Sequence, residues 1–304
     1  MKNIIEIEKL NKSFGEIKAV NNLTFSVGEG QLFAFLGVNG AGKSTTISII
    51  CGQLAKDSGK VVIDGEEIDG NTEIIKGEIG VVFQNSVLDK PLTVYDNIKS
   101  RAAAYGITGK CFEERLKKLT EMFALDDILK RPVGKLSGGQ RRRADVARAL
   151  VHEPKILILD EPTTGLDPQT RKMLWKTVSD LRKETKMTVL LTTHYMEEAA
   201  DADYVVIIDA GKISAEGTPI ELKNKYAGDF ITFYEADEER IKKLGLNYEK
   251  IGGAIRTEVP NTAAATKLIL ENPDMFADYE ITKGKMDDVF LAVTGKKLLG
   301  EERK

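Results

Sequence analysis

The sequence predicts an α/β protein with a mixed, mainly parallel sheet, followed by a small α+β domain. Three observations support this. The apolar run QLFAFLG ends in glycine and is followed by KSTTISIICGQL, which suits a helix. The same order recurs in KILILDEP, PQTRKMLWKTVSDLRKET and MTVLLTTH, so central strands bury both faces and helices cross between them. A new series of short strands and helices begins near Asp229.

The remaining elements follow in chain order. NIIEIEKLNKSF and AVNNLTFSV alternate apolar and polar residues, which predicts a half-exposed antiparallel sheet at one side. Between Thr93 and Leu129 apolar residues recur at intervals of three and four, which predicts a helical insertion. The C-terminal order of elements is strand, helix, strands, helix, strand, helix, and it favours a ferredoxin-like sandwich. The predicted divisions are a first domain at 1–226 with a helical subdomain at about 90–150, a second at 229–296, and a charged tail at 297–304.

Size and composition narrow the functional classes. The chain has 304 residues, 42% of them hydrophobic, enough for one medium domain and a smaller second one. The formal net charge is -3 and the basic residues are spread along the chain, so no nucleic-acid partner is predicted. Cys51 and Cys111 are expected to be free thiols, because neither has a second Cys or a His at metal-ligand spacing.

The sequence predicts a cytoplasmic protein. The start, MKNIIEIEKL, carries charges every few residues and lacks the apolar core of a secretory signal. Residues 31–55 contain a single charge, but glycines interrupt them and no uncharged segment reaches the ~18 to 20 residues of a bilayer span. Any role at a membrane is therefore expected to come through a partner.

The segment GVNGAGKS, residues 37–44, fits the pattern G-x-x-x-x-G-K-[ST] between a predicted strand and a predicted helix. Its glycines let successive N–H groups point into one concavity, and the helix start adds a dipole that favours anions. Lys43 is expected to reach the terminal phosphates of a nucleotide, and Ser44 to bind Mg²⁺. The alternative is a glycine-rich turn with a surface lysine, which the flanking strand and helix argue against.

KILILDEP, residues 155–162, is an apolar strand that runs into Asp160 and Glu161. Two carboxylates are thus expected near the phosphate loop, where parallel strands end. Asp160 suits the outer shell of a magnesium ion, and Glu161 can orient or deprotonate an attacking water. Alone, a strand ending in DEP could simply cap the following turn.

A third motif, LSGGQ at residues 136–140, precedes a predicted helix. A helix beginning near Ser137 offers unpaired N–H groups and a positive dipole end, Gly138 and Gly139 permit close backbone approach, and the Ser137 hydroxyl adds a donor. The sequence therefore predicts a second phosphate receptor here. For the following Arg141, Arg142 and Arg143, two interpretations stay open: a solvated helix face, or contact with phosphates or a partner.

Over roughly residues 3–225 the chain resembles the nucleotide-binding subunit of an ATP-binding cassette (ABC) transporter. The resemblance rests on GVNGAGKST, VVFQ ending at Gln84, LSGGQ, ILILDEP, GLDP at 165–168 and LTTH ending at His194, in the family's order. LSGGQ is highly specific, whereas the phosphate loop alone is not. The resemblance implies an ABC-type P-loop NTPase that uses ATP and Mg²⁺ and hydrolyses ATP to ADP and phosphate.

The resemblance also implies roles for individual residues. LSGGQ closes over the γ-phosphate held by a facing subunit, so two such domains, in the simplest case a homodimer, enclose two nucleotides. Gln84 contacts the magnesium or the attacking water, Asp167 contacts the facing subunit, and His194 holds the γ-phosphate and water beside Glu161. Phe14 stacks on adenine and Val20 lies against it. The implied sets are catalytic Glu161, His194 and Gln84; magnesium-binding Ser44, Gln84 and Asp160; and nucleotide-binding Phe14, Val20, Gly37, Asn39, Gly40, Ala41, Gly42, Lys43, Ser44, Thr45, Ser137, Gly138, Gly139, Gln140 and Asp167.

Within the family, LTVYDNIKSRAAAYGI together with an ending in MDDVFLAVTG resembles the ATPase subunits of ABC-2 type exporters, including those similar to daunorubicin exporters. Such subunits dock on a separately encoded membrane permease, which implies a peripheral position on the inner face of the cell membrane. Exported drugs, antibiotics or lipids are the expected cargo. An importer ATPase with a regulatory C-terminal domain stays an alternative, and a non-transport ABC ATPase is a more remote one, because this chain has one uninterrupted cassette.

Overall fold

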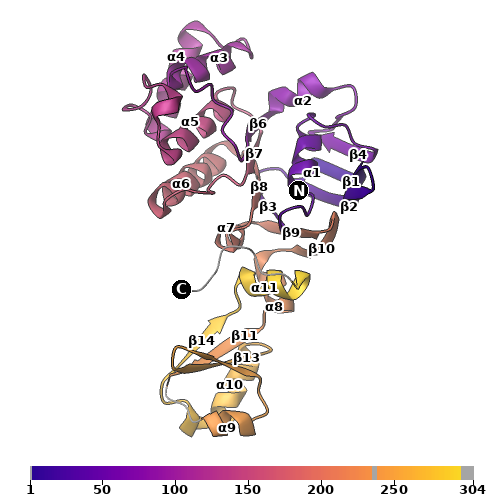
Figure 1. Cartoon of the computed structure of the whole chain (residues 1–304), viewed down its shortest axis with the longest axis vertical. Coiled ribbons are helices and arrows are strands. Elements are labelled where there is room, and N and C mark those ends of the chain that lie inside the picture. The colour runs from indigo at the N-terminus through magenta and orange to yellow at the C-terminus, as the bar shows by residue number, and fades with distance from the viewer. Residues whose placement is uncertain (1, 235–237, 296–304) are drawn as a thin grey trace. The chain divides into compact units, whose positions relative to one another are not determined.

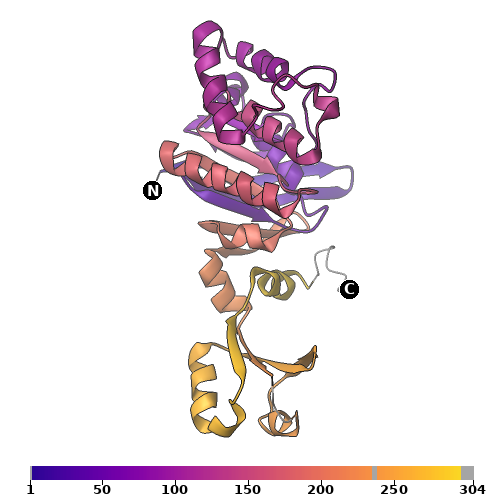
Figure 2. The ribbon, with the colours of Figure 1, turned by 90° about the vertical axis from the view of Figure 1, so that its left-hand side faces the viewer.

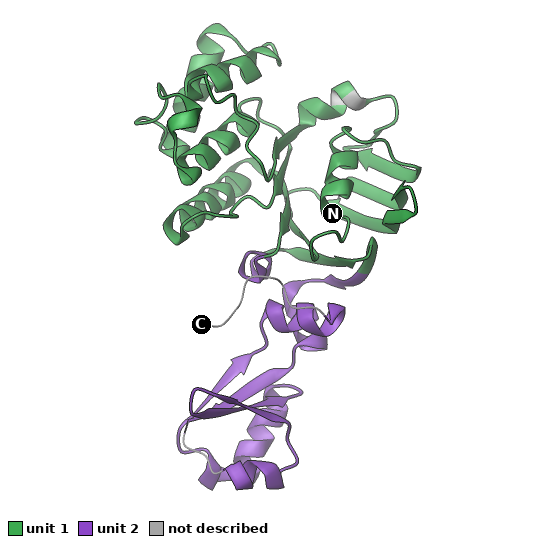
Figure 3. Cartoon of the chain, in the orientation of Figure 1, with its two compact units in different colours: residues 1–194, 202–213 green, residues 195–201, 214–304 purple. Residues whose placement is uncertain are grey.

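The computed structural model of the chain describes residues 2–234 and 238–295. The predicted tail at 297–304 lies outside the described residues, as does residue 296. The chain divides into two compact units, Met1–His194 with Ala202–Ile213, and Tyr195–Asp201 with Ser214–Lys304 (Figure 3). The boundary proposed from sequence at 226–229 remains a prediction.

A six-stranded sheet has the strand order β10-β9-β3-β8-β7-β6 (Figure 1), and all its strands except β10 lie wholly in the first unit. Neighbouring strands from β9 to β6 run parallel, which confirms the mainly parallel sheet. The strand bounds are β3 Leu32–Leu36, β6 Ile79–Val82, β7 Ile156–Asp160, β8 Thr188–Thr193, β9 Tyr204–Asp209 and β10 Lys212–Gly217. The carboxyl ends of these parallel strands share one edge, where the candidate site lies.

Helices cover both faces of this sheet, as the continuous apolar strands require. Alternate residues of β7 face opposite ways: Leu157 and Leu159 pack with residues of α5 and α6, whereas Ile156 and Ile158 pack with residues of α1. Figure 2 shows α6 crossing one face. The bounds are α1 Lys43–Ile50, α5 Gly138–Leu150 and α6 Pro168–Thr185.

A second, antiparallel sheet confirms the half-exposed sheet predicted from the N-terminal alternation. Its order is β2-β1-β4-β5, and β1 pairs with β2 and with β4 in antiparallel register. The bounds are β1 Asn3–Phe14, β2 Ile17–Gly28, β4 Ser58–Ile63 and β5 Glu66–Glu67. Sequence reasoning missed β4, which pairs along β1 about fifty residues away in the chain.

The stretch between Thr93 and Leu129 is mostly helical, as predicted. After α2 (Thr72–Glu78) and β6 come α3 (Val94–Ala103), α4 (Gly109–Phe123), a short 3₁₀ turn (Val133–Lys135) and α5. Phe112, Leu116 and Leu119 recur on one face of α4 and are buried with Val94 and Ile98 of α3. This packing builds a small helical core of which α5 is a part.

The second unit contains a four-stranded antiparallel sheet of order β12-β13-β11-β14. With one helix after the first strand and one after the third, this is the βαββαβ topology, and it confirms the ferredoxin-like prediction. The bounds are α7 Met196–Ala200, α8 Pro219–Tyr226, β11 Asp229–Phe233, α9 Glu238–Lys243, β12 Tyr248–Ile251, β13 Ala254–Val259, α10 Thr262–Glu271, a 3₁₀ turn Pro273–Met275, β14 Tyr279–Lys283 and α11 Met286–Thr294.

Within residues 2–234 and 238–295, no helix combines the length and the apolar composition needed to cross a bilayer.

Candidate nucleotide site

The phosphate loop connects β3 to α1, as its motif predicts. Gly42 precedes α1 with φ at +107°, a conformation that L side chains rarely adopt, and an added Cβ there would overlap the Ala19 carbonyl oxygen. At Gly37 an added Cβ would lie 2.7 Å from the Ile208 carbonyl oxygen. These two glycines therefore let the loop pass close to neighbouring backbone while it turns into the helix.

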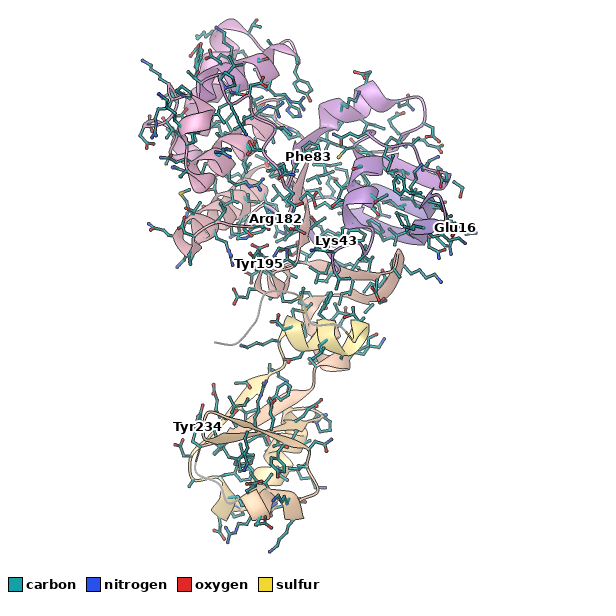
Figure 4. The ribbon with its side chains drawn as sticks, viewed as in Figure 1. Glu16, Lys43, Phe83, Arg182, Tyr195 and Tyr234 are labelled. Atoms are coloured by element: carbon teal, nitrogen blue, oxygen red, sulfur yellow. The ribbon has the colours of Figure 1, made fainter. Side chains whose placement is uncertain are left out.

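Lys43 is the first residue of α1 and is almost fully buried, 5% exposed (Figure 4). Its Nζ donates to the carbonyl oxygens of Gly37 (2.7 Å) and Val38 (3.2 Å), so the ammonium closes the loop on itself. Burial lowers the pKa of Lys43, and the negative charges of Glu161 and Asp160 partly offset this. The fold thus places the Lys43 ammonium close enough to the predicted carboxylates of Asp160 and Glu161 for their charges to act on its pKa.

Asp160 ends β7 and is 7% exposed. The hydroxyl of Thr192, from the neighbouring strand β8, donates to Asp160 Oδ1 at 2.5 Å. The same Thr192 oxygen accepts from the N–H of Glu161 at 3.1 Å. One buried hydroxyl therefore orients the carboxylate of Asp160 and the backbone of the next residue together.

We expect Thr192→Val to lower the free energy of unfolding by about 1–3 kcal/mol, because it leaves a buried carboxylate oxygen without its donor. Thr46→Val is the matched control: Thr46 is also fully buried, but its hydroxyl donates to Gly42 O, which still accepts from the Thr46 N–H at 3.0 Å. Urea unfolding of both variants measures the difference. Equal losses would show that the Thr192 hydroxyl has no special role.

Glu161 lies at the centre of the site. Its φ of +46° is left-handed, a strained conformation for glutamate, and its N–H donates to the Thr192 carbonyl oxygen at 3.0 Å. Three side chains surround its Oε2 atom: Gln84 Nε2 donates at 3.1 Å, the Thr164 hydroxyl donates at 3.3 Å, and His194 Nδ1 lies 3.3 Å away. Strand ends β6, β7 and β8 thus bring Gln84, Glu161 and His194 together.

The predicted second phosphate receptor is the N-terminus of α5. Ser137 is its N-cap: Ser137 Oγ accepts from the Gln140 N–H at 3.2 Å, and Gln140 Oε1 accepts from the Ser137 N–H at 3.1 Å. This capping box leaves the Ser137 hydroxyl hydrogen able to donate. Ser137 and Gly138 are exposed, so the helix start faces outward.

The three consecutive arginines near the start of α5 all bind backbone carbonyl oxygens of this chain. Arg141 donates to Leu136 O, and Arg143 donates to Phe123 O and Ala124 O. Arg142 is 7% exposed and donates to Phe83 O at 2.6 Å and Gln84 O at 2.8 Å. Of the two open interpretations, a solvated face is therefore wrong for Arg142, which is structural.

Three further predicted residues have other neighbours. Asp167 is the N-cap of α6, and the bonds it accepts from the Thr170 hydroxyl (2.6 Å) and N–H (2.9 Å) lower the pKa of Asp167. Phe14 ends β1 and is 50% exposed as a residue, and Lys12 Nζ lies 5.6 Å from its ring centroid. Val20 is buried in the core. Their roles toward a nucleotide or a facing subunit stay predictions.

Sequence reasoning missed Thr164 and Thr192, and it left the role of Arg142 open. A partial signal existed for Thr192, because a threonine inside the otherwise apolar strand TVLLTT must find a hydrogen-bond partner when it is buried. The partner, 32 residues earlier in the chain, could not be identified before the strand order was known.

The residues predicted to bind magnesium fit that ion. Ser44, Gln84 and Asp160 offer a hydroxyl, an amide and a carboxylate, and Mg²⁺ prefers such oxygen ligands in small number, completed by water and substrate phosphates. The described residues contain no cluster of three or more His, Cys, Asp or Glu that could hold a metal. The donor set therefore suits a magnesium ion bound jointly with phosphates.

Comparison with known proteins gives concordant matches. The family model described as "ABC transporter" matches residues 20–164. The chain is 36% identical to Nod factor export ATP-binding protein I of Ralstonia nicotianae, over 97% of this chain and 95% of that protein. It is 39% identical to linearmycin resistance ATP-binding protein LnrL of Bacillus subtilis, over 75% of this chain and 73% of that protein.

Among solved structures, the chain is similar to the dimeric, post-hydrolysis structure of the ATP-binding cassette MJ0796 bound to ADP and Pi. The TM-score is 0.66 at 27% identity, covering 70% of this chain and 98% of that one.

Proposed function

Because this chain belongs to the ABC transporter family of ATP-binding subunits, we propose that two copies of it bind two ATP molecules between them, each at a site that both copies complete. The chain is an ATPase whose turnover powers a separate permease of exporter type. The observation that carries the proposed site is the cluster of Gln84, Thr164 and His194 around one oxygen of Glu161. The negative charge of Glu161 also acts on the pKa of Lys43 in the phosphate loop.

One half of each site comes from the phosphate loop side. In this proposal the N–H groups at the start of α1 and the ammonium of Lys43 bind the terminal phosphates, and Phe14 stacks on the base. Ser44, Asp160 and Gln84 hold Mg²⁺, which when bound neutralises phosphate charge. Glu161 accepts the proton of the attacking water, a role worth roughly 10²–10⁴ in rate, and His194 and Gln84 orient that carboxylate and water.

The other half comes from the second copy. The exposed start of α5, with Ser137 and Gly138, presents N–H groups and the positive end of a helix dipole to the γ-phosphate. The dimeric state of the similar cassette MJ0796 supports this arrangement. Closure around ATP and opening after hydrolysis then give the two states that drive the permease.

The named relatives act in Nod factor export and linearmycin resistance, which supports an exporter over an importer. We propose that this chain docks on a permease at the inner face of the cell membrane and powers the export of drugs, antibiotics or lipids.

Replacing Gly138 with aspartate tests the shared site. Nothing lies within 4 Å of an added Cβ at Gly138, so the chain accommodates the side chain, but its carboxylate repels the facing phosphate. We expect G138D to lose ATPase turnover while ATP still binds. Gly77→Asp is the control, because Gly77 of α2 also has open space around it. Wild-type turnover by G138D would contradict the shared site.

Mixing two inactive variants sharpens this test. G138D keeps an intact phosphate loop, and Lys43→Ala keeps an intact α5 start, so a mixed dimer contains one complete site. If the copies exchange freely, half of the dimers are mixed, and about one quarter of wild-type turnover returns. If each chain hydrolysed ATP alone, mixing would restore nothing.

A further inference from the structure

The segment that carries Gln84 is held by a single helix, α5. Phe83 and Gln84 directly follow β6. Arg142 of α5 donates one guanidinium N–H to Phe83 O (2.6 Å) and another to Gln84 O (2.8 Å). Phe83 is labelled in Figure 4. These two carbonyl oxygens belong to consecutive residues, so one rigid planar group fixes the peptide on both sides of the Gln84 α-carbon.

The next turn of α5 holds the other end of the segment. Asp145 Oδ1 accepts from the Ser86 hydroxyl at 2.9 Å, and the Asp145 carboxylate also accepts from the Val87 N–H. Asp145 lies three residues after Arg142, so both side chains project from the same face of the helix. One face of α5 therefore binds the segment of residues 83 to 87 at two points, through Arg142 and through Asp145.

Both gripping side chains are buried, Arg142 at 7% and Asp145 at 5% exposed. Burial lowers the pKa of Arg142 and raises the pKa of Asp145, which reflects the desolvation that each group bears. Apolar residues of similar volume at these two positions would stabilise the fold at least as well as the charged pair does. What two buried charged groups add here is a fixed geometry for the segment they bind.

We propose that Arg142 and Asp145 are positioning residues that hold Gln84 at Glu161 and make it move together with the start of α5. The Gln84 side chain reaches Glu161 Oε2 at 3.1 Å, while Ser137, five residues before Arg142, begins the same helix. This inference rests on the proposed function of both sites. A shift of α5 toward a facing nucleotide is thereby transmitted to the catalytic carboxylate of its own chain.

Arg142→Met tests the proposal in the full-length chain, because methionine fills similar space without a donor. We expect kcat to fall about tenfold through misplacement of Gln84, with an unchanged KM for ATP. Arg143→Met is the matched control. It removes a guanidinium from the same helix that binds Phe123 O and Ala124 O instead, and its kcat is expected to stay within about twofold of wild type.

A double-mutant cycle separates positioning from general loss of structure. If Arg142 acts through Gln84, then R142M adds nothing to Gln84→Ala, and the double variant keeps the turnover of Q84A within about twofold. Independent effects that multiply, or a wild-type kcat for R142M, would overturn the proposal.

Asp145→Asn, which retains an acceptor for Ser86 and Val87, is expected to keep more turnover than Asp145→Leu.

Ser86→Ala covers the case in which R142M does not fold. Ser86 is exposed, so the substitution spares the core. It removes the bond to Asp145 and the longer bond of 3.4 Å that Ser86 Oγ accepts from the Leu88 N–H. We expect about a threefold lower kcat, which disappears in the Q84A background. Glu161→Gln is measured alongside. If E161Q keeps full turnover, the proposed function fails. If E161Q is inactive but S86A and Q84A effects multiply, only the positioning role fails.

Discussion

Glu161→Gln is expected to leave ATP binding intact while reducing turnover by roughly 10²–10⁴, because glutamine fills the same space but cannot accept the proton of the attacking water. Glu161 Oε2 receives donors from Gln84 and Thr164, and a glutamine oxygen can accept the same bonds. The variant therefore preserves the geometry and removes the base. The measurement is phosphate release under saturating MgATP beside nucleotide binding by calorimetry.

The same variant is expected to accumulate as a dimer in the presence of MgATP, because hydrolysis is the step that reopens the pair. Size-exclusion chromatography with and without nucleotide detects this. Glu184→Gln, an exposed glutamate of α6, is the control and is expected to turn over as wild type. Normal phosphate release by E161Q would mean that another group is the base.

The parts of the site that sequence predicted best are those in which neighbouring residues make the chemistry. In the phosphate loop, Gly37, Gly42 and Lys43 form one local turn, so spacing alone identifies it. The helix start at Ser137 was likewise predicted, and the capping box that fixes it lies within the four residues from Ser137 to Gln140. Where a structural feature depends only on residues close together in the chain, their identity and spacing are enough to predict it.

The contacts around Glu161 could not be predicted in the same way, because they join distant parts of the chain. Gln84 is 77 residues from Glu161, and Arg142 is 58 residues from Gln84. These pairs meet only because β6 and β7 are neighbours in the sheet and α5 packs beside them. Motif resemblance implied which residues belong to the site, but not which atom each one contacts.

The arginines of α5 illustrate the point. Three consecutive arginines near the start of a helix oppose the helix dipole, so neither charge nor spacing explains them. The structure supplies three separate carbonyl targets, at Leu136, at Phe83 with Gln84, and at Phe123 with Ala124. The Leu136 target of Arg141 is local, whereas tertiary packing brings the targets of Arg142 and Arg143 to the helix, so the roles of these two arginines become visible only in the folded chain.

Lys43→Ala is expected to weaken ATP binding by at least about two orders of magnitude. The ammonium is a charged donor that faces the phosphates from inside the loop, and a hydrogen bond to a charged group is worth about 1.5–3 kcal/mol. Alanine also removes the two bonds to Gly37 O and Val38 O that close the loop, so the N–H groups of the concavity lose their arrangement. Isothermal calorimetry with ATP measures the loss.

The fold itself should tolerate this substitution. Burial lowers the pKa of Lys43, which means that the folded chain bears a desolvation cost for its charge, and alanine removes that cost. We therefore expect a melting temperature close to wild type, so that lost binding reflects the site. Lys56→Ala, which removes a partly buried lysine paired with Asp69, serves as the control for charge. Because each nucleotide site of the proposed dimer contains one phosphate loop, unchanged ATP affinity in K43A would refute the proposed site, including the roles of Glu161 and α5.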